Sequence, residues 1–337
     1  MVKFYKYYFT RNYFLAKIPR ISIFEKIMSV RKIIIQTLMG AVSALPLSVH
    51  RANAHLVGWI AHRLVRYRLK VVEDNIAKCF PEADEKQRKR YVKDFYLHFG
   101  RLVCETIWFS HVTPKRMEKS KIISVINPEE TSRLLSVAPS VICLSGHYSN
   151  WEILFGFEHA QLPKGREQSY ALRRDNAALV YKRLQNPLWD EIFREARLSL
   201  LGKDFPNYIE SANILRHVVE HKNDGFFYLF ETDQRPYANA KAVMDVQFMG
   251  RPAQTMYAGA GVAHKYGLAV TYLSMRRNSS RTGYECEFKT ICDDASKMEI
   301  QEIMNEFYRL LEEDIRYEPG EYLWSHKRWK LVNKNTK

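Results

Sequence analysis

The most informative stretch of this chain reads Val141-Ile-Cys-Leu-Ser-Gly-His-Tyr-Ser-Asn-Trp-Glu152. Its first five residues form a short apolar run, which is typical of a buried strand. His147 and Glu152 are five residues apart, and one regular helix would separate their side chains by roughly 140°. The two side chains therefore converge only if His147 leaves the strand in a loop and Glu152 lies in the first turn of a helix. Ser149 with Glu152 spells a capping box, which predicts that a helix begins there.

A histidine that a carboxylate orients at the end of a strand can accept the proton of a hydroxyl group. The structural alternative is that Glu152 only caps a helix and His147 only hydrogen-bonds a loop. Isolated H-x4-E matches are common by chance, so the motif alone leaves both interpretations open.

Other stretches of the chain separate these interpretations. They are Val72-Glu-Asp-Asn-Ile-Ala-Lys-Cys-Phe-Pro81, Arg173-Arg-Asp-Asn176, residues 225–230 followed by Asp233-Gln234, Phe248-Met-Gly-Arg-Pro-Ala-Gln-Thr255 and Tyr322-Leu-Trp-Ser-His-Lys-Arg-Trp-Lys330. Together with residues 147–152, they resemble, in chain order, the motifs of the bacterial late lipid A acyltransferases, a branch of the glycerolipid acyltransferase superfamily. The resemblance covers about residues 33 to 330, and ordered motifs are far more specific than one short match.

The resemblance implies an α/β fold of the glycerolipid acyltransferase type, in which helices flank a central mixed sheet and an N-terminal helix anchors the chain to a membrane. It also implies transfer of an acyl chain from acyl-acyl carrier protein to a hydroxyl of a lipid A precursor, at the cytoplasmic face of the bacterial inner membrane. His147 would be the general base and Glu152 would orient it. No cofactor is implied, because the acyl carrier protein serves as a co-substrate.

Attack on a thioester creates an oxyanion, which needs hydrogen-bond donors. The resemblance makes Asn150, Arg173 or Arg174, and backbone amides around Gly146 candidates for this role, with Asn176 in the same block as the arginines. The family pattern is R-x-x-x-N, whereas this block is more compact, so which arginine is functional stays open.

Two further groups of residues are implied at the site. Asp233 and Gln234 are expected to hold the active-site loops rather than to touch the reacting atoms. Arg328, with His326, Lys327 and Lys330 beside it, is expected to bind a phosphate or carboxylate of a saccharolipid.

The hydrophobic pattern predicts alternating strands and helices. Val92, Phe95 and Phe99 recur at helical spacing and predict a helix over residues 85–109. Short apolar runs predict strands at 121–126, 141–145, 168–172, 226–230, 268–275 and 284–289, with helices near 150–160, 175–196, 208–221, 254–266 and 297–316. This alternation describes an α/β protein whose site lies at strand ends.

The N-terminus suggests contact with a membrane. Residues 1–32 carry eight Lys or Arg against the single acid Glu25, and residues 33–49 are uncharged. Seventeen helical residues would span only about 26 Å, so the segment is marginal for crossing a bilayer. We expect an anchor over residues 1–49 and one catalytic domain over 50–337, with either Met1 or Met28 as the natural start.

Composition is compatible with an anionic partner. The net charge of +15 indicates nucleic acid or an acidic lipid surface. Three functions follow: a lipid A acyltransferase, the same chemistry on another acceptor such as a phosphatidylinositol mannoside, a polyene or an aminolipid, or a non-catalytic basic surface protein. No nucleic-acid module is recognisable, and we expect an anionic glycolipid, the acyl carrier protein and the inner membrane as partners.

The sequence also predicts chemistry without a metal ion or a nucleotide. The five cysteines show no C-x-x-C or histidine-paired spacing, and no phosphate-binding loop is present. Acyl transfer should therefore persist in excess chelator. Loss of transfer that a divalent ion restores would reveal a ligand set that these spacings do not show.

Overall fold

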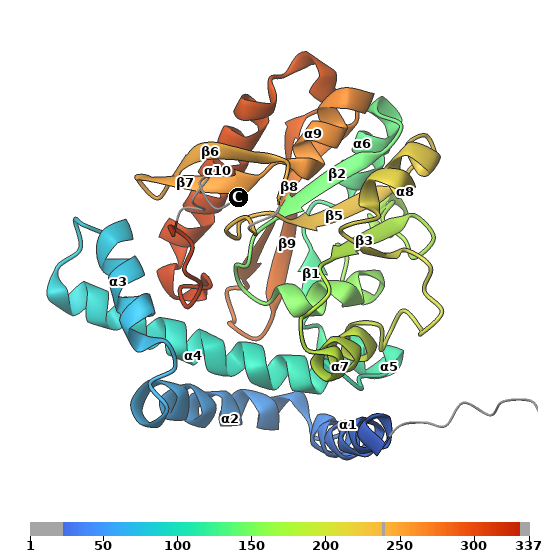
Figure 1. Ribbon diagram of the computed structural model, residues 1–337. Helices are drawn as coiled ribbons and strands as arrows, with labels where there is room; N and C mark the ends of the chain where they lie inside the picture. The colour runs from blue at the N-terminus through green and yellow to red at the C-terminus, as the bar shows by residue number, and fades with distance from the viewer. Residues whose placement is uncertain (1–22, 238–239, 331–337) are drawn as a thin grey trace, which may run out of the picture.

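A seven-stranded sheet forms the centre of the computed structural model, which describes residues 23–237 and 240–330 (Figure 1). Its strands, in chain order, are β1 (Ile123–Val125), β2 (Val141–Ser145), β3 (Ala177–Tyr181), β4 (Tyr208–Glu210), β5 (Phe227–Glu231), β8 (Ala269–Arg277) and β9 (Tyr284–Cys292). The spatial order is β1-β9-β8-β2-β5-β3-β4. Strands β8, β2, β5, β3 and β4 run parallel, whereas β9 is antiparallel to β8 and parallel to β1. The predicted α/β class with a mixed central sheet is confirmed.

Helices cover both faces of this sheet. The α-helices of the described residues are α1 (Ile23–Ser43), α2 (Leu47–Trp59), α3 (Leu69–Cys79), α4 (Glu85–Phe109), α5 (Pro114–Ser120), α6 (Glu129–Val137), α7 (Pro187–Arg197), α8 (Ile214–His221), α9 (Ala258–Tyr266) and α10 (Ile300–Tyr317). Of these, α1 and α2 pack against α4 rather than on the sheet (Figure 1). A separate hairpin consists of β6 (Val243–Phe248) and β7 (Arg251–Met256).

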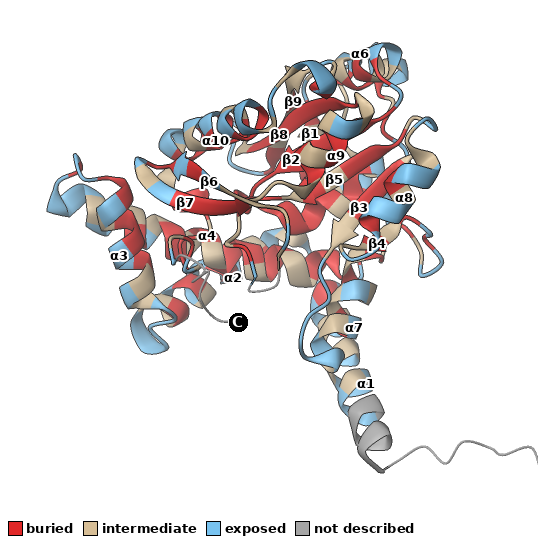
Figure 2. Cartoon of the chain, turned by 45° about the horizontal axis from the view of Figure 1, so that its top comes forward, coloured by how far each residue is buried: buried red, intermediate tan, exposed pale blue. Residues whose placement is uncertain are grey.

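Alternating side chains of β2 enter two different cores. Ile142 and Leu144 join the core beneath α8, α9 and α10, while Val141 and Cys143 join the core beneath α5, α6 and the end of α4. All five residues of β2 are buried, and Figure 2 shows buried residues along the central strands. A strand that is buried on both faces reads as a continuous apolar run, which explains why this one could be predicted.

Most predicted elements are present. The helix predicted over residues 85–109 is α4, which begins with a capping box between Asp84 and Gln87. Five of the six predicted strands correspond to β1, β2, β5, β8 and β9.

The strand predicted at 168–172 is wrong, because a short 3-10 turn and irregular chain occupy that segment. The adjacent strand, β3, lies inside the stretch predicted as helix from 175 to 196, and β4 opens the stretch predicted as helix from 208. Both strands are only three to five residues long and lie toward one edge of the sheet, so β3 depends on pairing with β5, and β4 on pairing with β3, rather than on local preference.

The N-terminal apolar run is not one helix. Helix α1 ends at Ser43, and Pro46 starts α2 as its N-cap, because proline cannot continue a preceding helix. Within the described ranges, no single helix is long and apolar enough to cross a membrane. Residues 30–43 and 47–64 together have the length and composition of a membrane span, but the two segments are bent by 113° relative to each other. Residues 1–22 of the predicted basic segment 1–32 lie outside the described residues, and the predicted boundary after residue 49 falls inside α2.

Helix α2 lies directly against α4, as Figure 1 shows at the base of the molecule. A Cβ atom added at Gly100 of α4 would come within 2.1 Å of the Ala54 carbonyl oxygen, and one at Gly58 within 2.4 Å of the Tyr96 carbonyl oxygen. The two backbones therefore touch at glycines that no larger residue could replace without separating the helices.

Candidate active site

Strand register brings His147 beside Asp233. Strands β2 and β5 are parallel neighbours with Ser145 opposite Glu231, so the residues two positions further along leave the same edge together. The Nδ1 atom of His147 lies 2.6 Å from Asp233 Oδ1, which also accepts the backbone N–H of His147 at 3.1 Å. Asp233 is 1% exposed, so this carboxylate is committed to the histidine.

The opposite nitrogen of His147 faces two polar groups. Nε2 lies 3.2 Å from Glu231 Oε2 and 2.9 Å from the carboxamide nitrogen of Gln234. The Trp151 ring meets the imidazole edge to face, with centroids 4.9 Å apart. The imidazole is thus held on three sides.

Two carboxylates control the protonation of His147. Burial alone would lower its pKa, but the charges and hydrogen bonds of Asp233 and Glu231 outweigh burial and raise the pKa to about 10. The imidazole is therefore protonated at neutral pH in this arrangement.

Glu152 is bound by an arginine and makes no hydrogen bond to His147. Arg197, the last residue of α7, donates to Glu152 from Nε at 2.8 Å and from Nη2 at 2.7 Å. Burial would raise the pKa of Glu152, but the charge and hydrogen bonds of Arg197 and the charge of His147 lower it. The expectation that Glu152 directly orients the imidazole is thus corrected, since Asp233 makes that contact and Glu152 remains a charged neighbour.

The short helix after His147 begins differently from the prediction. Glu152 does lie in the first turn of a helix, a 3-10 helix over Trp151–His159, but its N-cap is Asn150 and no capping box forms. Ser149 has a φ of +58°, and its hydroxyl donates to Glu321 instead. A left-handed residue at this point turns the chain so that the helix starts one residue later than the S-x-x-E pattern predicts.

The loop that carries His147 is held by the C-terminal segment and by α4. The backbone N–H of Leu323 donates to the His147 carbonyl oxygen at 3.1 Å, and that of Ser149 donates to the Glu321 carbonyl oxygen at 2.9 Å. Asn150 is fully buried and donates from Nδ2 to Glu105 of α4 at 2.8 Å. The predicted oxyanion role of Asn150 is not favoured, because its amide donor already serves a buried carboxylate.

The arginine block 173–176 lies at the opposite edge of the sheet. Asn176 accepts the backbone N–H of Phe227, the first residue of β5, whereas His147 and Asp233 follow the other ends of β2 and β5. Five residues of strand separate these edges by about 13 Å. The predicted grouping of Arg173, Arg174 and Asn176 with the base is therefore wrong.

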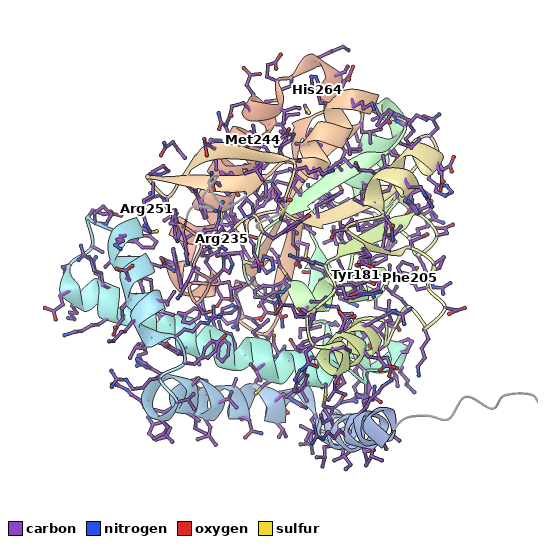
Figure 3. All side chains as sticks on the ribbon, viewed as in Figure 1. Tyr181, Phe205, Arg235, Met244, Arg251 and His264 are labelled. Atoms are coloured by element: carbon purple, nitrogen blue, oxygen red, sulfur yellow. The ribbon has the colours of Figure 1, made fainter. Side chains whose placement is uncertain are left out.

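These residues build a local turn instead. Arg174 donates from Nε to the Leu201 carbonyl oxygen and lies over the Phe205 ring, while Asn176 Oδ1 accepts the N–H of Arg173. Figure 3 labels Phe205, the ring that Arg174 contacts, and Tyr181, the last residue of β3.

Sequence reasoning missed Glu231 and Arg197, and it overlooked a spacing. Lys182 and Asn186 follow β3 with three residues between them, which matches R-x-x-x-N with lysine in the first position. Because β3 is parallel to β5, this pair leaves the sheet on the same side as His147. A search for the spacing after each apolar run would have found it.

Arg328 does not face a ligand. It is 1% exposed, donates to the Gln254 carbonyl oxygen at 2.7 Å and to the Tyr308 hydroxyl at 2.8 Å, and lies over the Phe248 and Tyr308 rings. The prediction that it binds a substrate anion is corrected, because its guanidinium instead links the C-terminal segment to the hairpin and to α10. Its neighbours Lys327 and Lys330 are exposed.

Among residues 23–237 and 240–330, no three His, Cys, Asp or Glu side chains are grouped as metal ligands would be. The carboxyl edge of the strands is where α/β sheets bind ligands, and a histidine that a carboxylate positions there can accept a proton.

The fold and this pair define an α/β protein with a buried histidine–aspartate pair at the carboxyl edge of its central sheet. Residues 25–331 match the sequence model described as bacterial lipid A biosynthesis acyltransferase. The chain therefore belongs to the bacterial lipid A biosynthesis acyltransferase family and is an acyltransferase of lipid A biosynthesis. A search among curated proteins found no match.

Substitutions of His147, Asp233 and Glu152 should differ in their effects on turnover and on stability. His147→Ala should abolish transfer, and Asp233→Asn should lower turnover by about 10²–10⁴-fold because the imidazole loses its anchor. Glu152→Ala should lower turnover by a similar factor of about 10²–10⁴, and it should also destabilise the fold by about 3–5 kcal/mol by removing the carboxylate that pairs with the partly buried Arg197. Single-turnover rates and thermal melting of the purified variants measure both effects. Near-normal turnover in folded His147→Ala protein would exclude this histidine as the base.

Proposed function

We propose that this protein is a membrane-associated acyltransferase that moves a fatty acyl chain from acyl-acyl carrier protein to a hydroxyl of a lipid A precursor. The observation that carries the proposal is His147, whose Nδ1 is held by buried Asp233 while Nε2 points to groups that a substrate can replace. Family membership supports the acyl transfer itself.

The reaction needs no acyl-enzyme intermediate. The acceptor hydroxyl donates its proton to Nε2 of His147 as its oxygen attacks the thioester carbonyl carbon. The tetrahedral intermediate then collapses, the carbon–sulfur bond breaks, and the imidazolium returns the proton to the departing thiolate. Asp233 stabilises the imidazolium in between, as the acid does in a hydrolase triad.

The acceptor hydroxyl takes the position that the Glu231 carboxylate now occupies. The Glu231 side chain is 31% exposed, so it can leave Nε2 without crossing the core. Its departure removes one of the two charges that raise the pKa of His147, so the pKa falls, Nε2 can release its proton to solvent, and the nitrogen is then free to accept the proton of the acceptor. The Gln234 carboxamide, 2.9 Å from Nε2, is placed to hydrogen-bond the same hydroxyl.

Exposed apolar side chains on the first helices support membrane association. Of the 20 large hydrophobic residues described as exposed, 12 lie between Val30 and Tyr67, among them Ile33, Leu38 and Trp59. An apolar surface of this extent on one flank is typical of a membrane-interaction site. We infer that α1 and α2 lie in the interface of the inner membrane, at the cytoplasmic face, where an acyl carrier protein donor is available.

The second candidate is the same chemistry on a phosphatidylinositol mannoside, a polyene or an aminolipid, because nothing in the base itself selects the acceptor. Mass spectrometry of lipid A from a strain that lacks this protein tests the choice. We expect loss of one acyl chain, restored by the wild-type chain and not by His147→Ala. Unchanged lipid A in the deletion strain would reject the proposed acceptor.

The pH dependence of transfer should report Glu231. A base whose pKa is raised is mostly protonated below that pKa, so kcat/KM of the wild-type enzyme should rise with pH through the neutral range. Glu231→Gln removes one of the charges that raise the pKa, so its rising limb should move to lower pH. Initial rates between about pH 6 and 9.5, with enzyme-free blanks for thioester hydrolysis, measure this shift. A rising limb at the same pH in both enzymes would show that Glu231 does not raise the pKa of the catalytic base.

Salt and detergent should distinguish apolar anchoring from charge attraction. Burial of apolar area is not weakened by salt, whereas attraction through Lys and Arg is screened over about 8–10 Å at ordinary ionic strength. The full-length chain should stay with membranes in high salt and leave with detergent, and removal of residues 1–27 should change this little if Met28 is the natural start. Release by salt alone would contradict the anchor.

A further inference from the structure

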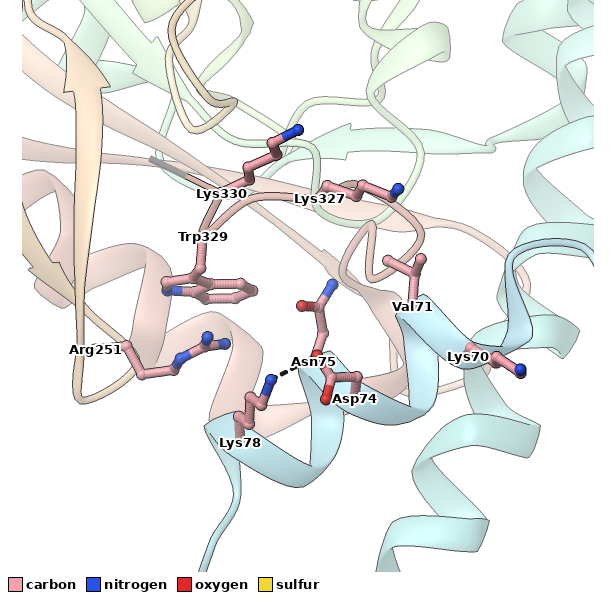
Figure 4. Close-up of a pocket in the computed structure, with 9 residues that line it drawn as sticks. All are labelled: Lys70, Val71, Asp74, Asn75, Lys78, Arg251, Lys327, Trp329 and Lys330. Carbon is pink, nitrogen blue, oxygen red and sulfur yellow. Dashed lines mark hydrogen bonds and ion pairs between the residues drawn. The ribbon is translucent and has the colours of Figure 1, made fainter. Parts of the chain in front are cut away.

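Five cations surround a pocket next to the C-terminal segment (Figure 4). Lys70 and Lys78 come from α3, Arg251 from the hairpin, and Lys327 and Lys330 from the segment after α10. The pocket has a volume of about 490 Å³, within the range for small ligand sites. Asp74 is its single acidic lining residue, so the pocket carries a large excess of positive charge.

Most of these cations have no carboxylate partner. Lys78 pairs with Asp74 at 2.7 Å, whereas Lys70, Lys327 and Lys330 form no ion pair within the described part of the chain. Arg251 lies over the Trp329 ring at 4.6 Å instead of facing an acid. Residues 331–337 contain no Asp or Glu side chain. Cations without carboxylate partners that line one concave surface attract an anion, and the concave wall strengthens their field.

The pocket walls are fixed by contacts that do not use these charges. Asn75 of α3 donates from Nδ2 to the carbonyl oxygens of Trp324 and His326, at 2.8 and 2.9 Å. Trp329 stacks on Phe248 with ring centroids 5.5 Å apart, and its Nε1 donates to the Phe248 carbonyl oxygen. Three separate chain segments are therefore held around the pocket before any ligand arrives.

The same segment connects the pocket to the base. Leu323 hydrogen-bonds the His147 carbonyl oxygen, and Lys327 follows four residues later, at most about 14 Å along the chain. One large head group can thus reach both places. Helix α3 also follows directly from the exposed apolar residues Leu64 and Val65, so the pocket lies beside the flank assigned to lipid.

We propose that this pocket binds a phosphate group carried by the glycolipid acceptor. The proposal rests on the proposed function and deepens it, because it assigns the recognition of the acceptor to Lys327, Lys330 and Arg251. An ammonium group and a guanidinium form charge-assisted hydrogen bonds with phosphate oxygens. The position beside the apolar flank favours a lipid head group over a soluble protein partner.

Kinetics on matched acceptors test the assignment. We compare the wild-type enzyme, K327Q/K330Q, and the control K115Q/K119Q, which removes the same charge from exposed lysines of α5. With the phosphorylated acceptor, K327Q/K330Q should raise the acceptor KM at least tenfold and leave kcat within about twofold, while the control matches wild type. With the phosphatase-treated acceptor, all three enzymes should show the same high KM.

Titration with inorganic phosphate provides a readout that does not depend on acyl transfer. The indole N–H signal of Trp329 should shift saturably in the wild-type and control proteins and remain unshifted in K327Q/K330Q. Absence of transfer to the glycolipid would reject the proposed function, while this titration would still report on the pocket. The pocket assignment is overturned if phosphate binding is equal in all three proteins, or if K327Q/K330Q raises the KM for acyl-acyl carrier protein instead of that for the acceptor.

Discussion

The parallel pairing of β2 with β5 is the constraint on which the active site depends. Ser145 lies opposite Glu231, and the Thr232 N–H donates to the Ser145 carbonyl oxygen, so His147 and Asp233 emerge side by side. A slip of one residue would turn every β2 side chain toward the opposite core. Because both faces of β2 are buried, such a slip is strongly disfavoured, and the register that stabilises the sheet also assembles the histidine–aspartate pair.

Charge balance explains why the site holds two cations among three carboxylates. His147 is protonated between Asp233 and Glu231, and Arg197 neutralises Glu152 next to it. A buried carboxylate without a partner would be costly, so the arginine at the end of α7 is needed even though it does not touch the imidazole. Each of the two cations thus faces at least one carboxylate.

Helix α4 joins the apolar flank to the catalytic loop. On one side it receives α2 at Gly100, and on the other Glu105 accepts from Asn150 and Arg101 pairs with Glu321, whose backbone holds Ser149. Burial would raise the pKa of Glu321, but His98 and Arg101 lower it to about 2, so the carboxylate stays charged at neutral pH. The helix that supports the exposed apolar flank is thus also the support of the loop that carries His147.

The sequence alone was sufficient to predict an element wherever the residues of that element show a clear hydrophobic pattern or a family motif. The apolar run before His147, the amphipathic period of residues 85–109 and the ordered motifs identified the strand, the long helix and the family. It failed for β3 and β4, which depend on pairing with a neighbour, and for residues 173–176, where a family pattern was matched at the wrong end of a strand. The choice of acid at the histidine was decided only by tertiary structure. Glu152 is five residues away in sequence, whereas Asp233 is 86 residues away and reaches Nδ1 through the register of two strands, a relation that no local pattern encodes.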